Sequence, residues 1–145
     1  DDLFDGSLSW QYRSVDALQE WQATYCPLST NDIVGDAAAQ PWLVFETTGR
    51  VVQMNFGEST QPSWVGEPFK ETRQKNPAIA FNQRGDRLIA WGESVSHSRG
   101  GRLNLRVFTA DGVETDYRLA EQVQIANFSF PAVAALPDGN FLVLH

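Results

Sequence analysis

The chain has 145 residues, and 11 Lys and Arg stand against 18 Asp and Glu, a formal net charge of −7. That balance argues against nucleic acid and anionic membrane surfaces as main partners, because both favour basic proteins. With 42% hydrophobic residues the chain can bury a core. No apolar run approaches the roughly 18 residues of a membrane-spanning helix. The single cysteine, Cys26, allows neither an internal disulfide nor a thiolate metal cluster.

Residues 1–40 differ in pattern from the rest of the chain and are expected to form a separate N-terminal region. Alternation over residues 8–12 predicts a strand. Ser14 is a suitable cap for a short helix that runs through Trp21, and acidic Asp16 in the first turn favours that start. Residues 26–40 are expected to be a polar connection.

A repeat begins at residue 41. Residues 77–91 align without a gap on residues 131–145 at an offset of 54, and residues 41–55 are a weaker third copy. Each copy consists of Pro, seven residues, Gly and an apolar run. Proline is harmless at the start of a strand, and glycine supplies the positive φ of a tight hairpin turn. The pattern therefore predicts three similar antiparallel hairpins.

The second copy is expected to continue into a four-stranded sheet. Apolar and polar residues alternate over 102–108, Asp111-Gly112 is a hairpin signal, and residues 113–119 are expected to form the fourth strand. Four antiparallel strands in a row are typical of one propeller blade. The predicted repeats are 41–75, 77–120 and an incomplete 131–145.

The string Pro-Ala-(Ile/Val)-Ala, a Gly turn and then Leu-Ile-Ala-Trp or Phe-Leu-Val-Leu resembles the BNR-type blade repeats of bacterial sialidase-like β-propellers. The resemblance covers the chain from residue 41 onward and implies an all-β, partial propeller of about three blades. The aspartate box Ser-x-Asp-x-Gly-x-Thr-Trp is absent, so no sialidase catalytic residue is carried over. Propellers close with roughly four to eight blades. Three alternatives stay open: missing blades supplied by a longer parent chain, a ring closed by self-association, or an open β-sandwich.

Two glutamates belong to a recurring aromatic-Gly-Glu-Ser motif, Glu58 after the first hairpin and Glu93 after the second. If the hairpins are equivalent, both carboxylates lie on the same face of the disc. Paired carboxylates there would act as acid and base on a glycosidic bond or hold a hard cation such as Ca²⁺. The alternative is that the motif ends a strand and its side chains bond to local backbone.

Two further residues are candidates for ligand contact. Trp64 lies in a Pro-rich segment, where an exposed ring would stack on a sugar. Arg99 belongs to an arginine-rich stretch over residues 84–106, and the guanidinium fork suits the carboxylate of an acidic sugar.

Sequence signatures of common enzyme classes are missing: there is no Gly-x-Ser-x-Gly, His-Glu-x-x-His, phosphate loop, dinucleotide glycine pattern or Cys-x-x-Cys. We therefore favour a non-catalytic binding or scaffold module that recognises a glycan or a partner protein through loops on one propeller face. No cofactor is expected beyond the Ca²⁺ alternative, and the resemblance favours the periplasm or cell exterior. The alternatives are a divergent glycoside hydrolase using Glu58 or Glu93, and a structural part of a larger propeller protein.

Overall fold

The structure is a computed structural model that describes residues 30–57, 61–65 and 72–145. These residues form an all-β arrangement with antiparallel pairing throughout, as expected. The described part of the chain contains no helix, and hence none that could cross a membrane. The strand predicted at 8–12, the helix predicted from Ser14 and the thiol of Cys26 lie outside the described residues.

The strands form three sheets. Sheet A has the order β1 (Asp32–Gly35), β2 (Pro41–Thr47), β3 (Arg50–Asn55) and β4 (Ser63–Trp64). Sheet B has the order β5 (Gln74–Phe81), β6 (Arg87–Glu93), β7 (Gly101–Phe108) and β8 (Gln124–Ile125). Sheet C is the hairpin of β9 (Ala132–Ala135) and β10 (Phe141–Leu144).

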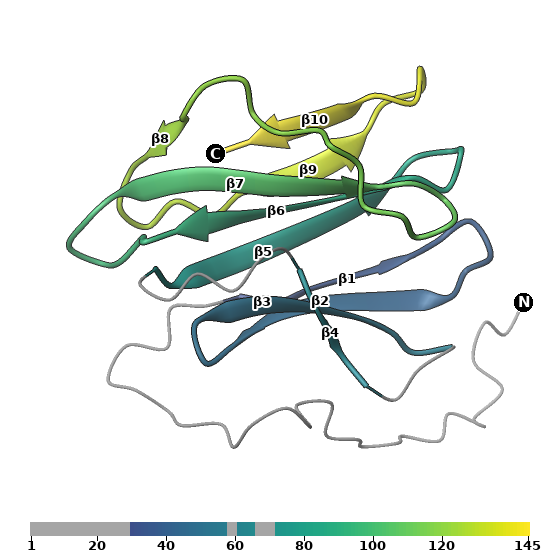
Figure 1. Cartoon of the computed structure of the whole chain (residues 1–145), viewed down its shortest axis with the longest axis horizontal. Coiled ribbons are helices and arrows are strands. Elements are labelled where there is room, and N and C mark those ends of the chain that lie inside the picture. Colours follow the sequence, from purple (N-terminus) through teal and green to yellow (C-terminus); the bar gives the residue numbers. More distant parts are fainter. Residues whose placement is uncertain (1–29, 58–60, 66–71) are drawn as a thin grey trace, which may run out of the picture.

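The three sheets lie one above another, with sheet B in the middle (Figure 1). The first strand of sheet B, β5, contacts β1 and β2 on one side and β9 on the other. Every residue of β6 is buried. Because successive side chains of a strand point to opposite faces, burial along the whole of β6 means that both faces of sheet B are covered.

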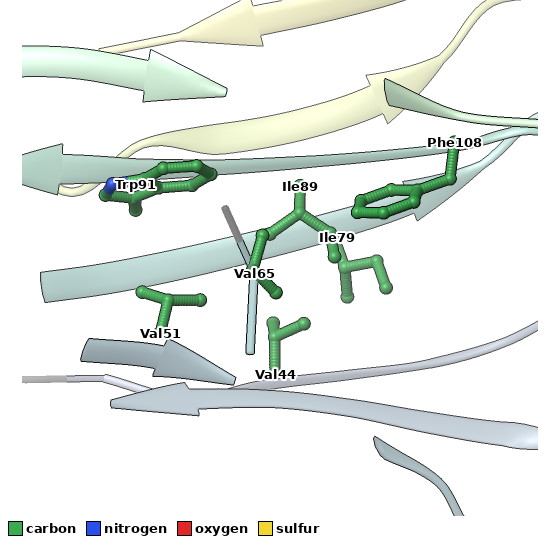
Figure 2. Packing of buried hydrophobic residues seen from close by; sticks show 7 residues of the cluster. All are labelled: Val44, Val51, Val65, Ile79, Ile89, Trp91 and Phe108. Atoms are coloured by element: carbon green, nitrogen blue, oxygen red, sulfur yellow. The ribbon is translucent and has the colours of Figure 1, made fainter. Parts of the chain in front are cut away.

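Two hydrophobic clusters hold the stack together. Between sheets A and B pack the side chains of Val44, Val51, Val65, Ile79, Ile89, Trp91 and Phe108 (Figure 2). Between sheets B and C pack Leu88, Ala90, Val95, Leu103, Leu105 and Ile125, with Val133, Phe141 and Val143 against them. Burying one large side chain of this kind contributes about 1.5–3 kcal/mol. The clusters explain why the apolar runs on either side of each turn must be strands rather than loops.

The first hairpin of each sheet contains the same five-residue turn. In all three turns the first amide donates to the fifth carbonyl and the fourth amide donates to the first carbonyl, in residues 36–40, 82–86 and 136–140. The fourth residue has a positive φ in each case: 58° at Ala39, 84° at Gly85 and 85° at Gly139. The repeating unit therefore begins at β1, β5 and β9.

This register corrects the predicted first copy. The hairpin over residues 41–55 is β2 and β3, the second and third strands of sheet A, whereas residues 77–91 cover the first and second strands of sheet B. The strand β1 lies in the segment expected to be a polar connection. The physical reason is Ala39, which takes the turn position where the other copies have glycine, so that the glycine pattern matched the following turn instead.

The fourth strand of sheet B also differs from its prediction. Residues 113–119 form only an isolated bridge, between Phe108 and Glu114, and the fourth strand is β8. The Thr115 amide donates to the Val107 carbonyl and the Leu103 amide to the Val123 carbonyl. The outer segment from Thr115 to Val123 thus spans eight residue steps beside the four steps of β7 from Val107 to Leu103. Its extra residues bend away from the edge of the sheet.

Candidate functional site

The departure of the outer segment from β7 leaves a cleft of about 290 Å³ at the edge of sheet B. Its strand side carries three polar side chains, from Glu93, Arg102 and Asn104. Residues 118–122 form the opposite wall. The cleft thus lies between β7 and the outer segment, which are hydrogen-bonded to each other at both ends of the cleft but not along its length.

Glu93 at the end of β6 lies at the floor of the cleft and is 1% exposed. The pairing of β6 with β7 sets Glu93 directly opposite Arg102, with Asn104 two positions further along the same face. The Glu93 Oε2 atom accepts from Asn104 Nδ2 at 2.8 Å and from Arg102 Nη2 at 3.4 Å. Its Oε1 atom accepts from Thr72 Oγ1 at 2.8 Å. Both carboxylate oxygens are therefore bonded to donors of the protein itself.

The outer wall is fixed by a chain of three charged side chains. Arg106 is 7% exposed, and its Nη1 donates to the Leu105 carbonyl at 2.8 Å, on the edge that the outer segment leaves open. Its Nε atom lies 2.9 Å from Glu114 Oε1, and Arg118 Nη2 donates to the same oxygen at 2.9 Å. Burial, reinforced by the charge of Arg118 and opposed by Glu114, lowers the pKa of Arg106. These contacts hold the outer segment in place where backbone pairing is missing.

The charges around the cleft sum to zero, with Arg102, Arg106 and Arg118 on one side and Glu93, Glu114 and Glu121 on the other. Arg102 is paired with Glu93, and Arg118 is paired with Glu114 and donates to backbone carbonyls of its own turn. Glu114 is shared between Arg106 and Arg118, and the exposed carboxylate of Glu121, which also lines the cleft, opposes the approach of an anionic ligand. The neutral polar groups of the lining with hydrogen-bonding capacity to spare include the Asn104 carbonyl oxygen and the Gln122 amide nitrogen, neither of which bonds to another described residue. The cleft thus offers neutral donors and acceptors.

The described residues of the two motifs, Phe56 and Gly57 in the first and Trp91 to Ser94 in the second, lie at opposite ends of their sheets rather than at the equivalent ends that the sequence predicts. The Phe56 amide donates to the Pro41 carbonyl, which places the first motif beside the β1–β2 turn. Glu93 pairs with Gln74, at the end of sheet B far from the corresponding turn. The motif follows the third strand in sheet A but ends the second strand in sheet B. Because neighbouring antiparallel strands run in opposite directions, the second and third strands end at opposite ends of a sheet. Glu58 itself lies outside the described residues.

Trp64 and Arg99 lie apart from the cleft lining. Trp64 is a half-buried residue of β4, and the Arg50 guanidinium carbon lies 3.6 Å from the centre of its ring. Partial burial lowers the pKa of Arg50. Arg99 is exposed in the loop between β6 and β7, where its carbonyl accepts from the Ser96 amide at 2.8 Å. No contact within the described ranges joins Trp64, Glu93 and Arg99.

The sequence-based prediction missed the residues that face Glu93. Arg102 belongs to the arginine-rich stretch and Asn104 to the polar half of an alternating strand, and neither pattern predicts that they face Glu93. Gln122 belongs to the surplus segment, which has no periodicity of its own. Within the described part of the chain, no three His, Cys, Asp or Glu side chains cluster so as to hold a metal ion.

Comparison of the chain with protein-family models, curated proteins and solved structures found no match. The sequence resemblance to sialidase-like blades therefore stays a prediction, and the case for function depends on the geometry described above.

Proposed function

We propose that this chain is a non-catalytic, propeller-type binding module that recognises a neutral glycan in the cleft at the edge of sheet B. The interpretation of the sheets as blades is supported by the shared turn of the first hairpins and by the face-to-face stacking of sheets A, B and C. The proposal follows the sequence resemblance in placing the module in the periplasm or at the cell exterior.

The charge balance of the cleft favours a neutral ligand over an acidic one. An acidic sugar requires an uncompensated cation, whereas both arginines of the lining have carboxylate partners and Glu121 adds a further negative charge to the cleft. A neutral sugar requires neighbouring donors and acceptors beside apolar surface, which Asn104 and Gln122 provide next to Leu119. The volume of about 290 Å³ is at the lower end of the range for small-molecule sites, roughly 300–1,000 Å³, and suits a short saccharide.

The state of Glu93 favours binding over hydrolysis. A glycosidase carboxylate must exchange a proton with the substrate or attack it. In this protein three donors, on Thr72, Arg102 and Asn104, already occupy both oxygens of Glu93. Glu93 is thus suited to orienting Asn104 in the cleft, and we assign it that positioning role.

A glycan array with neutral and acidic oligosaccharides, followed by calorimetric titration of the best neutral binder, tests the proposal. Gln122→Ala is expected to weaken binding about five- to tenfold, because one hydrogen bond contributes about 1 kcal/mol. Gln83→Ala is the matched control, an exposed glutamine in the β5–β6 turn away from the cleft. Absence of neutral binders, or equal effects of the two substitutions, would overturn the proposal.

A further inference from the structure

One face of sheet A packs on sheet B, and the other face is turned away, at the opposite end of the stack from sheet C (Figure 1). Residues directly opposite each other in an antiparallel pair lie on the same face of the sheet. The register therefore places a group of large apolar side chains on the outer face of sheet A: Ile33, Leu43, Phe45, Val52, Met54 and Trp64.

The part of this outer face that belongs to β3 is fully buried. Val52 is 0% exposed and Met54 is 2% exposed. Apolar side chains on an uncovered face of the same protein keep much of their exposure, since Leu142 and Leu144 on the outer face of sheet C are 44% and 60% exposed. Neighbours within sheet A would leave Val52 and Met54 similarly exposed, so a further layer covers them.

The described strands of the other sheets do not supply this layer. The strand β5 contacts β1, β2 and β3, but its Ile79 packs with Val44 and Val51, on the opposite face of sheet A. Val52 and Met54 belong to neither of the two hydrophobic clusters that join the sheets. The covering side chains therefore come from residues outside the ranges 30–57, 61–65 and 72–145.

We propose that residues 1–29 pack on the outer face of sheet A and cap this end of the stack. The shorter ranges 58–60 and 66–71 contain one large apolar side chain besides Pro68, that of Phe69. Residues 1–29 contain many, among them Phe4, Leu8, Trp10, Leu18 and Trp21. They lead into β1 at the edge of sheet A, and β3 is two strand spacings from β1, about 10 Å. Terminal units of repeat architectures need such a cap, because their apolar outer face would otherwise meet water.

Paramagnetic relaxation enhancement in the full chain tests the proposal. Cys26→Ser removes the native thiol, and a nitroxide is then attached at Ser7→Cys in one sample and at Gln19→Cys in another. In at least one sample the amide signals of Val52 and Met54 should lose intensity, while those of β9 and β10 keep theirs. If neither label reaches Val52 or Met54, or if the signals of sheet C are lost instead, the proposal is wrong.

Substitutions within residues 1–29 test whether apolar packing holds the cap in place. Leu8→Asp combined with Trp21→Asp puts a charge in each half of the segment, and because a buried charge is costly, the Val52 and Met54 signals should recover their intensity. Gln11→Asp combined with Gln22→Asp is the matched control, which adds the same charge at polar positions and should leave the broadening unchanged. Unchanged amide shifts in β6 and β7 verify that sheet B is folded in both variants. Broadening that persists in the Leu8 and Trp21 variant would overturn the proposal.

Discussion

Ala39 adopts a φ of 58° in the turn position where the other two first hairpins have glycine. The left-handed region costs a residue with a Cβ about 1 kcal/mol relative to glycine. We predict that Ala39→Gly raises the free energy of unfolding by about 0.5–1 kcal/mol, measured by urea denaturation. The gain is smaller than the strain relieved because glycine also loses more entropy on folding.

The reciprocal substitution is the control. Gly85→Ala is expected to lower the free energy of unfolding by about 1–2 kcal/mol, because Gly85 has a φ of 84° and its new Cβ would lie 3.2 Å from the Ala110 Cβ. If both substitutions changed stability in the same direction, the equivalence of the two turns would be contradicted.

Asp86 makes the same turn sensitive to pH. Hydrogen bonds from the Asn82 amide and the Arg84 guanidinium lower the pKa of Asp86. A carboxyl whose pKa is lower in the folded state stabilises the protein above the unfolded pKa of about 3.9, and this contribution is lost as pH falls through the folded value. We predict a loss of stability below about pH 4 that is smaller in Asp86→Asn. Urea unfolding between neutral and acid pH measures it, and identical pH profiles for the two proteins would refute it.

At the scale of elements, the buried arginine of β6 joins sheet B to sheet A. The Arg87 guanidinium carbon lies 4.4 Å from the ring centres of both Trp42 and Phe108, and its Nε donates to Gln53 Oε1 at 3.0 Å. Burial lowers the pKa of Arg87. A planar guanidinium stacks between two rings, whereas an ammonium does not.

We therefore predict that Arg87→Lys lowers the free energy of unfolding by about 1–3 kcal/mol. Arg87→Met separates stacking from charge, because it keeps apolar volume between the rings and removes the buried cation. The measurement is urea denaturation followed by tryptophan fluorescence. A Lys variant as stable as the wild type would show that the stacked geometry contributes nothing.

Glu93 connects the end of β6 and the first half of β7 to Thr72, two residues before the start of β5. We predict that Glu93→Gln lowers the free energy of unfolding by about 1.5–3 kcal/mol, since three bonds to a charged acceptor are weakened. Glu121→Gln, on the exposed outer wall of the cleft, is the control and should be near neutral. Urea denaturation compares the two variants. A stable Glu93→Gln variant that loses a glycoside-hydrolysing activity of the wild type would instead support the hydrolase hypothesis.

At the scale of the whole molecule, the sequence predicts where the hairpins lie better than it predicts which strands of the three sheets correspond to one another. The hairpins at 77–91 and 131–145 are predicted correctly because Gly85 and Gly139 mark the same turn. Strand β1 is missed because the equivalent turn has Ala39 in place of glycine. This one difference shifts the predicted first copy by a whole strand. A glycine pattern indicates where the backbone can adopt a positive φ at low energy. It does not indicate whether the next strand is the second or the third of its sheet.

The candidate site was predictable only in part, for a related reason. Glu93 is identified from its motif, but its partners Arg102 and Asn104 come from the register of β6 with β7. The outer wall depends on how far residues 115–123 leave the sheet edge. That distance is set by the hydrogen bonds at the two ends of the segment, and no local residue pattern encodes it.

Neutral-glycan recognition in the cleft is tested most directly by an amide chemical-shift map of the whole chain, titrated with neutral disaccharides and separately with sialyllactose. The neutral sugars should cause saturable shifts concentrated at Leu103, Asn104 and residues 118–122, and sialyllactose should cause none there. Shifts centred on Trp64 or Arg99, or a response to the acidic sugar alone, would contradict the assignment.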